Sequence, residues 1–101
     1  MNDKPIVYTL DANEQPVGIQ LSDVKTDRSV WPRLKTDIGD YRVSTIFLTV
    51  DHNFEEGPPV LWETVVFSGK GHSVYEKRYT SGNDARRGHN EAIAWVIDRF
   101  S

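Results

Sequence analysis

The fold is decided by residues 41–67, which read YRVSTIFLTV (41–50), DHNFEEGPP (51–59) and VLWETVVF (60–67). The first and third runs are rich in β-branched and aromatic residues, and both faces of their alternating pattern carry apolar groups. Such runs are typical of central strands in a sheet. We therefore predict two antiparallel core strands, over residues 41–50 and 60–67, joined by a loop over residues 51–59.

The segments next to this hairpin predict further strands. Residues 68–71 read SGKG, a tight-turn signal, and residues 74–79 alternate as a third, more polar strand. Residues 6–10 and 17–19 predict a short N-terminal hairpin. This hairpin should lie at an edge, because proline and glycine weaken its return strand.

Residues 20–40 are the least patterned part of the chain. Apolar residues recur at loosely helical spacing over residues 21–31, which predicts one short helix that ends at Pro32. Residues 37–40 read DIGD and predict a turn into the first long strand.

The C-terminal segment predicts a helix. Ser81 and Asp84 have the spacing of a capping box, and Thr80 is an equally good cap. Gly88 costs such a helix about 1 kcal/mol relative to alanine, which a close approach of the helix to the sheet would explain. One helical stripe carries the apolar side chains together with a histidine: Ala85, His89, Ala92, Ile93, Val96 and Phe100.

Together these elements predict an α+β fold over a single domain, residues 1–101. Its core is an antiparallel β meander of three main strands. An N-terminal hairpin is added to the meander, and a C-terminal helix packs across one sheet face. Because both sheet faces carry apolar groups, the second face needs a cover. Residues 1–36 would supply it, or else a homodimer or a partner protein.

Composition excludes several classes of function. The chain has 15 acidic and 12 basic residues, a net charge of -3, which makes nucleic acid an unexpected partner. There is no cysteine, so disulfides, thiolate catalysis and cysteine-ligated zinc are excluded. The sequence shows neither a signal peptide nor a membrane span, and we expect a cytoplasmic protein without a cofactor.

The loop between the core strands is the best candidate for a partner-binding site. Phe54 lies between Asn53 and the acidic pair Glu55 and Glu56, and a diproline ends the loop. A constrained aromatic residue with a charged rim is typical of an interface anchor. Trp62, on the adjoining strand, completes the predicted surface. The alternative is that Phe54 folds back onto the sheet as a lid on the core.

A second interpretation is a small metal-dependent hydrolase that uses Asp51, His52 and His89. Imidazole and carboxylate are common metal ligands, and Asp51 with His52 could act as a general-base pair. The spacing does not support this interpretation, because neither an H-x-x-x-H nor an H-E-x-x-H motif occurs. The competing interpretation of His89 is a core histidine that hydrogen-bonds a backbone carbonyl or a carboxylate.

A third interpretation is weak nucleic-acid binding through a small basic cluster near the start of the predicted helix. The cluster consists of Lys77, Arg78, Arg86 and Arg87. Most such clusters are solvated surface, and the acidic total weakens this interpretation.

Several short runs occur in one order along the chain: YTLD (8–11), PV (16–17), RVSTIFL (42–48), DHNF (51–54), PP (58–59), WETVVF (62–67), RYT (78–80), and Ala85 followed by GH (88–89). With these runs the chain resembles a group of small proteins of tailed bacteriophages and prophages. Residues 20–36 depart from the group, which usually has a tryptophan-bearing helix where Pro32 stands here. The resemblance implies a phage accessory protein made in the infected bacterium, and it carries no established activity. Such proteins often bind a host protein, including components of defence systems.

Overall fold

A computed structural model describes residues 7–13, 15–19, 33–51, 53 and 56–100. The N-terminal hairpin consists of β1 (Val7–Leu10) and β2 (Pro16–Ile19). A four-stranded antiparallel sheet follows in the order β3-β4-β5-β6. Its strands are β3 (Arg33–Ile38), β4 (Tyr41–Phe47), β5 (Trp62–Phe67) and β6 (Ser73–Tyr79), and the chain continues into the helix α1 (Gly82–Phe100).

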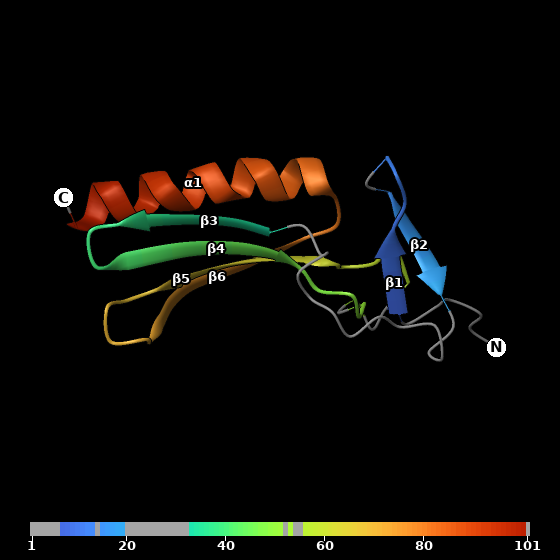
Figure 1. The fold of residues 1–101 in the computed structure, drawn as a ribbon, viewed down its shortest axis with the longest axis horizontal. Helices are drawn as coiled ribbons and strands as arrows, with labels where there is room; N and C mark the ends of the chain where they lie inside the picture. Colours follow the sequence, from blue (N-terminus) through green and yellow to red (C-terminus); the bar gives the residue numbers. More distant parts are fainter. Residues whose placement is uncertain (1–6, 14, 20–32, 52, 54–55, 101) are drawn as a thin grey trace.

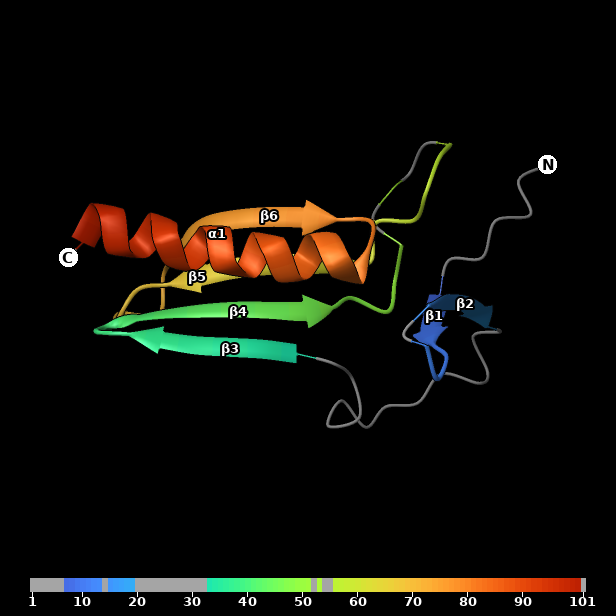
Figure 2. The ribbon, with the colours of Figure 1, turned by 90° about the horizontal axis from the view of Figure 1, so that it is seen from above.

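This architecture confirms the predicted α+β fold, including the hairpin, the meander and the C-terminal helix (Figure 1). Helix α1 contacts all four strands of the larger sheet and runs along one of its faces (Figure 2). The hairpin lies beyond the end of this sheet, where β4 ends and β5 begins. The backbone hydrogen bond from Tyr8 N to Thr49 O (2.7 Å) and a bridge between Val7 and Val50 connect it there.

The prediction of three main strands was wrong, because β3 adds a fourth at the edge. Its sequence, RLKTDI, is mostly polar and exposed, so it carries no core pattern of its own. Pairing with β4, from Arg33 opposite Ile46 to Ile38 opposite Tyr41, makes it a strand. The predicted turn into β4 is confirmed at Gly39 and Asp40, where Gly39 has a φ of 56°. The predicted helix over residues 21–31 lies outside the described residues.

The two central strands are shorter than predicted, since β4 stops at Phe47 and β5 begins at Trp62. Thr49 has a φ of 66°, and Val50 N donates to Leu48 O at 2.6 Å. A tight turn of this kind cannot continue a pleated strand.

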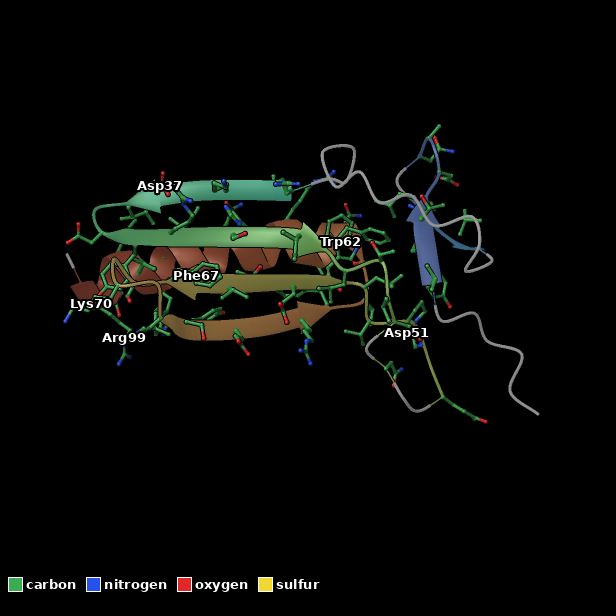
Figure 3. All side chains as sticks on the ribbon, turned by 60° about the horizontal axis from the view of Figure 1, so that its bottom comes forward. Asp37, Asp51, Trp62, Phe67, Lys70 and Arg99 are labelled. Atoms are coloured by element: carbon green, nitrogen blue, oxygen red, sulfur yellow. The ribbon has the colours of Figure 1, made fainter. Side chains whose placement is uncertain are left out.

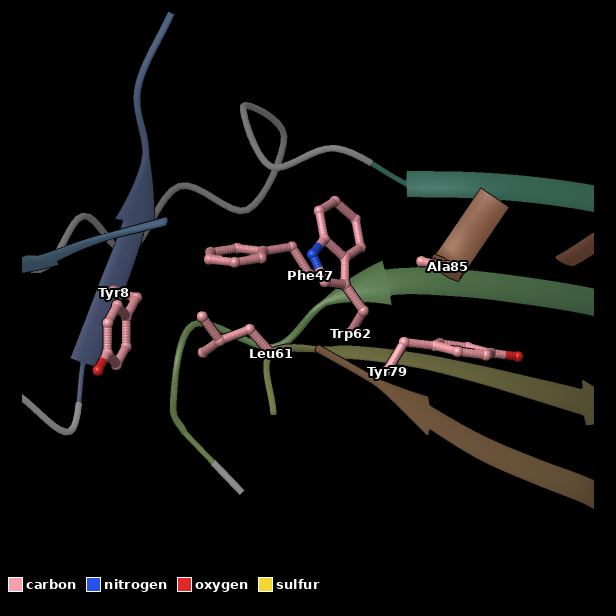
Figure 4. Close-up of a cluster of buried hydrophobic side chains, with 6 residues drawn as sticks. All are labelled: Tyr8, Phe47, Leu61, Trp62, Tyr79 and Ala85. Atoms are coloured by element: carbon pink, nitrogen blue, oxygen red, sulfur yellow. The ribbon is translucent and has the colours of Figure 1, made fainter. Parts of the chain in front are cut away.

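The core lies between α1 and one face of the sheet. Figure 4 shows the cluster at the hairpin end, which consists of Tyr8, Phe47, Leu61, Trp62, Tyr79 and Ala85. A second cluster at the other end consists of Val43, Val66, Ala92 and Val96. On both central strands the residues that face α1 are buried, and their alternating neighbours face the other side.

Two local predictions for α1 are confirmed. The Ser81 hydroxyl accepts a hydrogen bond from the Asp84 amide at 3.1 Å, as in an N-cap. Gly88 lies so close to the Tyr79 ring that a Cβ at this position would overlap the ring and its hydroxyl. Glycine therefore allows the helix to approach the sheet here.

Candidate functional site

The loop between β4 and β5 is held at its base by one carboxylate. Asp51 is 6% exposed, and its Oδ1 accepts hydrogen bonds from the backbone amides of Asn53 (2.7 Å) and Val60 (2.8 Å). The first of these is an Asx turn, and the second joins the two ends of the loop. Asp51 thus closes the loop where it leaves the sheet.

A second hydrogen bond crosses the loop. The Asn53 side-chain amide donates from Nδ2 to the carbonyl of Pro58 at 2.9 Å. Gly57, with a φ of 127°, lies beside this amide, and a Cβ on Gly57 would come within 3.4 Å of Asn53 Nδ2. That distance is an ordinary contact, so it is the backbone conformation that favours glycine here.

The tip of the loop faces solvent. Glu56, Gly57 and Pro58 are exposed, while Asn53 is half-buried. Two residues of the predicted partner-binding site, Phe54 and Glu55, lie outside the described residues. The structure therefore places Asn53 and Glu56 together on one constrained loop at the hairpin end of the sheet, where Figure 3 labels Asp51.

Trp62, the remaining residue of the predicted partner-binding site, lies in the core instead. Its side chain is 6% exposed and packs edge-on against Phe47, with ring centroids 5.3 Å apart (Figure 4). The alternating pattern of β5 places Trp62 on the face that α1 covers. Trp62 therefore belongs to the core cluster and offers little surface to a partner.

His89 is a core histidine, but its partners are hydroxyl groups. The ring is 4% exposed, with Nδ1 2.7 Å from Thr45 Oγ1 and Nε2 2.9 Å from Thr36 Oγ1. Thr45 Oγ1 also lies 2.5 Å from Thr64 Oγ1. The resulting chain of hydrogen bonds crosses β3, β4 and β5 beneath α1. Burial lowers the pKa of His89 below its usual 6.5.

This threonine–histidine chain was not predicted, although part of its signal is in the sequence. Thr45 and Thr64 occupy inward positions on neighbouring strands, opposite each other in register. Buried hydroxyl groups require hydrogen-bond partners. Here the Thr45 hydroxyl bonds both to the Thr64 hydroxyl and to the imidazole of His89. Thr36 could not have been placed, because β3 itself was not predicted.

The three residues of the metal interpretation do not form a described site. Both ring nitrogens of His89 contact threonine hydroxyls beneath the helix, and Asp51 accepts two backbone hydrogen bonds at the loop base. His52 lies outside the described residues. Among the residues that the structure describes, no group of three histidine, aspartate or glutamate side chains could hold a metal ion.

The basic cluster is interleaved with carboxylates. Arg78 Nε lies 2.9 Å from Glu63, and Lys77 Nζ lies 3.7 Å from Glu91. Arg87 forms an ion pair with Asp84 within α1. Arg86 borders a different small cleft, together with Arg33 and Trp62. The surface along β6 and α1 therefore alternates in charge, unlike a continuous phosphate-binding stripe.

Comparisons with family models, with curated proteins and with solved structures find no match to this chain. Within the described part of the chain, no helix combines the length and the hydrophobicity that a membrane span requires.

Proposed function

We propose that this protein is a non-enzymatic phage accessory protein that binds a host protein stoichiometrically through the loop of residues 51–59. The observation that carries the proposal is the constraint on this loop. Asp51 and Asn53 tie its two ends together, while its tip remains exposed. A loop whose two ends are held together loses less conformational entropy when a partner binds, so more of the contact energy contributes to affinity.

The chemistry of the loop indicates the kind of contact. Glu56 supplies negative charge at the exposed tip, and the sequence adds Glu55 and the aromatic Phe54 beside it. An apolar anchor with an acidic rim fits a partner surface that combines a hydrophobic pocket with basic residues. A host protein, such as a defence-system component, is the partner that the resemblance to phage proteins favours.

A non-enzymatic role is supported by where the reactive side chains lie. The carboxylate of Asp51 stabilises the loop, and His89 is enclosed between the helix and the sheet. A general base must reach a proton of its substrate, and a 4% exposed imidazole between two threonines is poorly placed to do so.

The test is capture of a binding partner by wild-type protein and by a triple variant, Phe54→Ala with Glu55→Lys and Glu56→Lys. Partners captured from bacterial lysate are identified by mass spectrometry, and the candidate is then purified and titrated by calorimetry. We expect a defined stoichiometry with wild-type protein and loss of binding with the triple variant.

A matched control separates this loop from a general effect of charge. Asp98, on the exposed end of α1, is changed to lysine, which reverses one charge just as Glu56→Lys does. Asp98→Lys should bind as wild type, whereas Glu56→Lys alone should weaken binding by about tenfold. Full binding by the triple variant, with an unchanged melting temperature, would show that the contact lies elsewhere.

A further inference from the structure

One face of the four-stranded sheet has no cover among the described residues. Helix α1 lies on the opposite face, and the hairpin lies beyond the end of the sheet (Figures 1 and 2). Figure 3 turns the uncovered face forward and labels Phe67 on it. Ile46, Phe67 and Val74 are 38%, 37% and 41% exposed. A shallow hollow of about 690 Å³ lies over the half of this face formed by β3 and β4.

The charges on this face are divided between its two halves. On β3 and β4 the charged side chains that alternate away from α1 are Arg33, Lys35, Asp37 and Arg42, three cations and one anion. On β5 and β6 they are Glu63, Glu76 and Arg78, two anions and one cation. One half of the face is therefore positive and the other half is negative.

We propose that a second copy of this chain docks onto this face, so that two sheets pack face to face around a twofold axis parallel to the strands. Rotation about such an axis reverses the strand order, so β3 of one copy faces β6 of the other and β4 faces β5. The positive half then meets the negative half on both sides of the axis. An isologous interface needs a self-complementary surface of this kind, and the chain carries both halves.

A twofold axis perpendicular to the strands is the alternative, and the row of residues across the middle of the sheet distinguishes between the two axes. The row runs Lys35, Ser44, Val65 and Glu76 across the four strands. With the axis parallel to the strands, Lys35 faces Glu76 of the second copy. An axis perpendicular to the strands would place Lys35 opposite Lys35 and Glu76 opposite Glu76, and both contacts are repulsive.

The outer rows are compatible with the same arrangement. Arg33 comes opposite Arg78 of the second copy, but Glu63 already neutralises Arg78 at 2.9 Å. Asp37 is neutralised by Arg42 at 2.8 Å. On β4 and β5, Val65 faces Ser44 of the second copy. Ile46 faces Glu63 and Phe67 faces Arg42, and both of these charged groups are already paired within their own chain.

The dimensions of the face predict a reversible dimer. Four strands about 4.8 Å apart, with about 3.3 Å per residue over seven residues, give a face of about 19 Å by 23 Å. This is small compared with the interfaces of permanent dimers, so dissociation should be measurable at micromolar concentrations.

Sedimentation equilibrium on the full chain tests the proposal, over protein concentrations from about 1 µM to about 1 mM. We expect the mass to rise from 11.6 kDa towards twice that value. Lys35→Glu and Glu76→Lys should each weaken the dimer by about tenfold or more, because each creates two like-charge contacts per dimer. A mixture of the two variants should associate as wild type, because the glutamate introduced in one variant then faces the lysine introduced in the other.

Asp98→Lys, on the far side of the molecule, is the control for charge and should leave the dimer unchanged. A mass of one chain at every concentration would overturn the proposal. So would a dimer that both variants leave intact, or a mixture of the variants that fails to restore association. The loop variants of the proposed function change residues 54–56, which belong to none of the four strands of this face, so the two proposals can fail independently.

Discussion

Gly88 in α1 leaves the space that the Tyr79 side chain of β6 fills. Gly88→Ala should therefore destabilise the protein, although alanine favours helices by about 1 kcal/mol over glycine. A Cβ at this position would overlap the Tyr79 ring, and overpacking of this kind costs about 1–3 kcal/mol. We expect the upper end of that range, because the overlap involves ring atoms as well as the hydroxyl. Thermal unfolding should show a melting temperature lower by several degrees.

Gly82→Ala is the matched control for this prediction. A Cβ on Gly82 would come 3.4 Å from the Trp62 ring, an ordinary van der Waals contact. This variant should melt close to wild type or above it. If Gly88→Ala also melted above wild type, helix propensity would outweigh the contact with Tyr79.

His89 should make stability depend on pH below neutrality. Burial lowers its pKa in the folded chain below the usual 6.5, so the unfolded chain binds the proton more readily. The stability associated with neutral His89 is complete above pH 6.5 and is lost as the pH falls from there towards the lowered pKa. Urea unfolding between about pH 7.5 and about pH 5 should show this loss.

His89→Gln should flatten that part of the pH profile, since glutamine can bond to a threonine hydroxyl but does not titrate. His72→Gln is the control, because His72 is exposed in the turn between β5 and β6. An identical slope in wild type and His89→Gln would assign the pH dependence to other groups.

Asp51→Ala should destabilise both the loop and the fold. It removes the acceptor for the amides of Asn53 and Val60, and hydrogen bonds to a charged group contribute about 1.5–3 kcal/mol each. We expect a loss of about 3 kcal/mol or more in the free energy of unfolding and faster amide exchange at residue 60. Asp51→Asn retains an oxygen acceptor and should lose less, so equal losses would contradict the hydrogen-bond explanation.

Thr49→Gly should stabilise the protein. A β-branched residue with a φ of 66° is strained by about 1–3 kcal/mol, whereas glycine adopts this conformation without a steric penalty. The Thr49 hydroxyl is also buried without a hydrogen-bond partner among the described residues. The backbone carbonyl that accepts from Tyr8 is retained. We expect a higher melting temperature in calorimetry.

Thr49→Ala separates the two contributions, because it removes the hydroxyl but retains a side chain at positive φ. It should gain less stability than glycine does. A melting temperature for Thr49→Gly below wild type would indicate that the packing of the threonine methyl group dominates.

Much of the fold followed from local pattern. The alternation around Val43 and Val66, the cap at Ser81 and the glycine at position 88 each predicted a feature that the structure contains. The strand β3 could not be predicted from local pattern, because its exposed polar residues form a strand only through pairing with β4. Because β3 was not predicted, its residue Thr36 could not be recognised as a hydrogen-bond partner of His89.

For the candidate site, the place of the loop between the two core strands, with its acidic and aromatic residues, could be predicted without a structure. Three features became visible only in the folded chain: Asp51 closes this loop, Trp62 is buried, and one sheet face is uncovered among the described residues and divided in charge. Alternation along a strand reveals which residues share a face. Which face the helix covers, and which strands become neighbours, depends on contacts between residues distant in the chain.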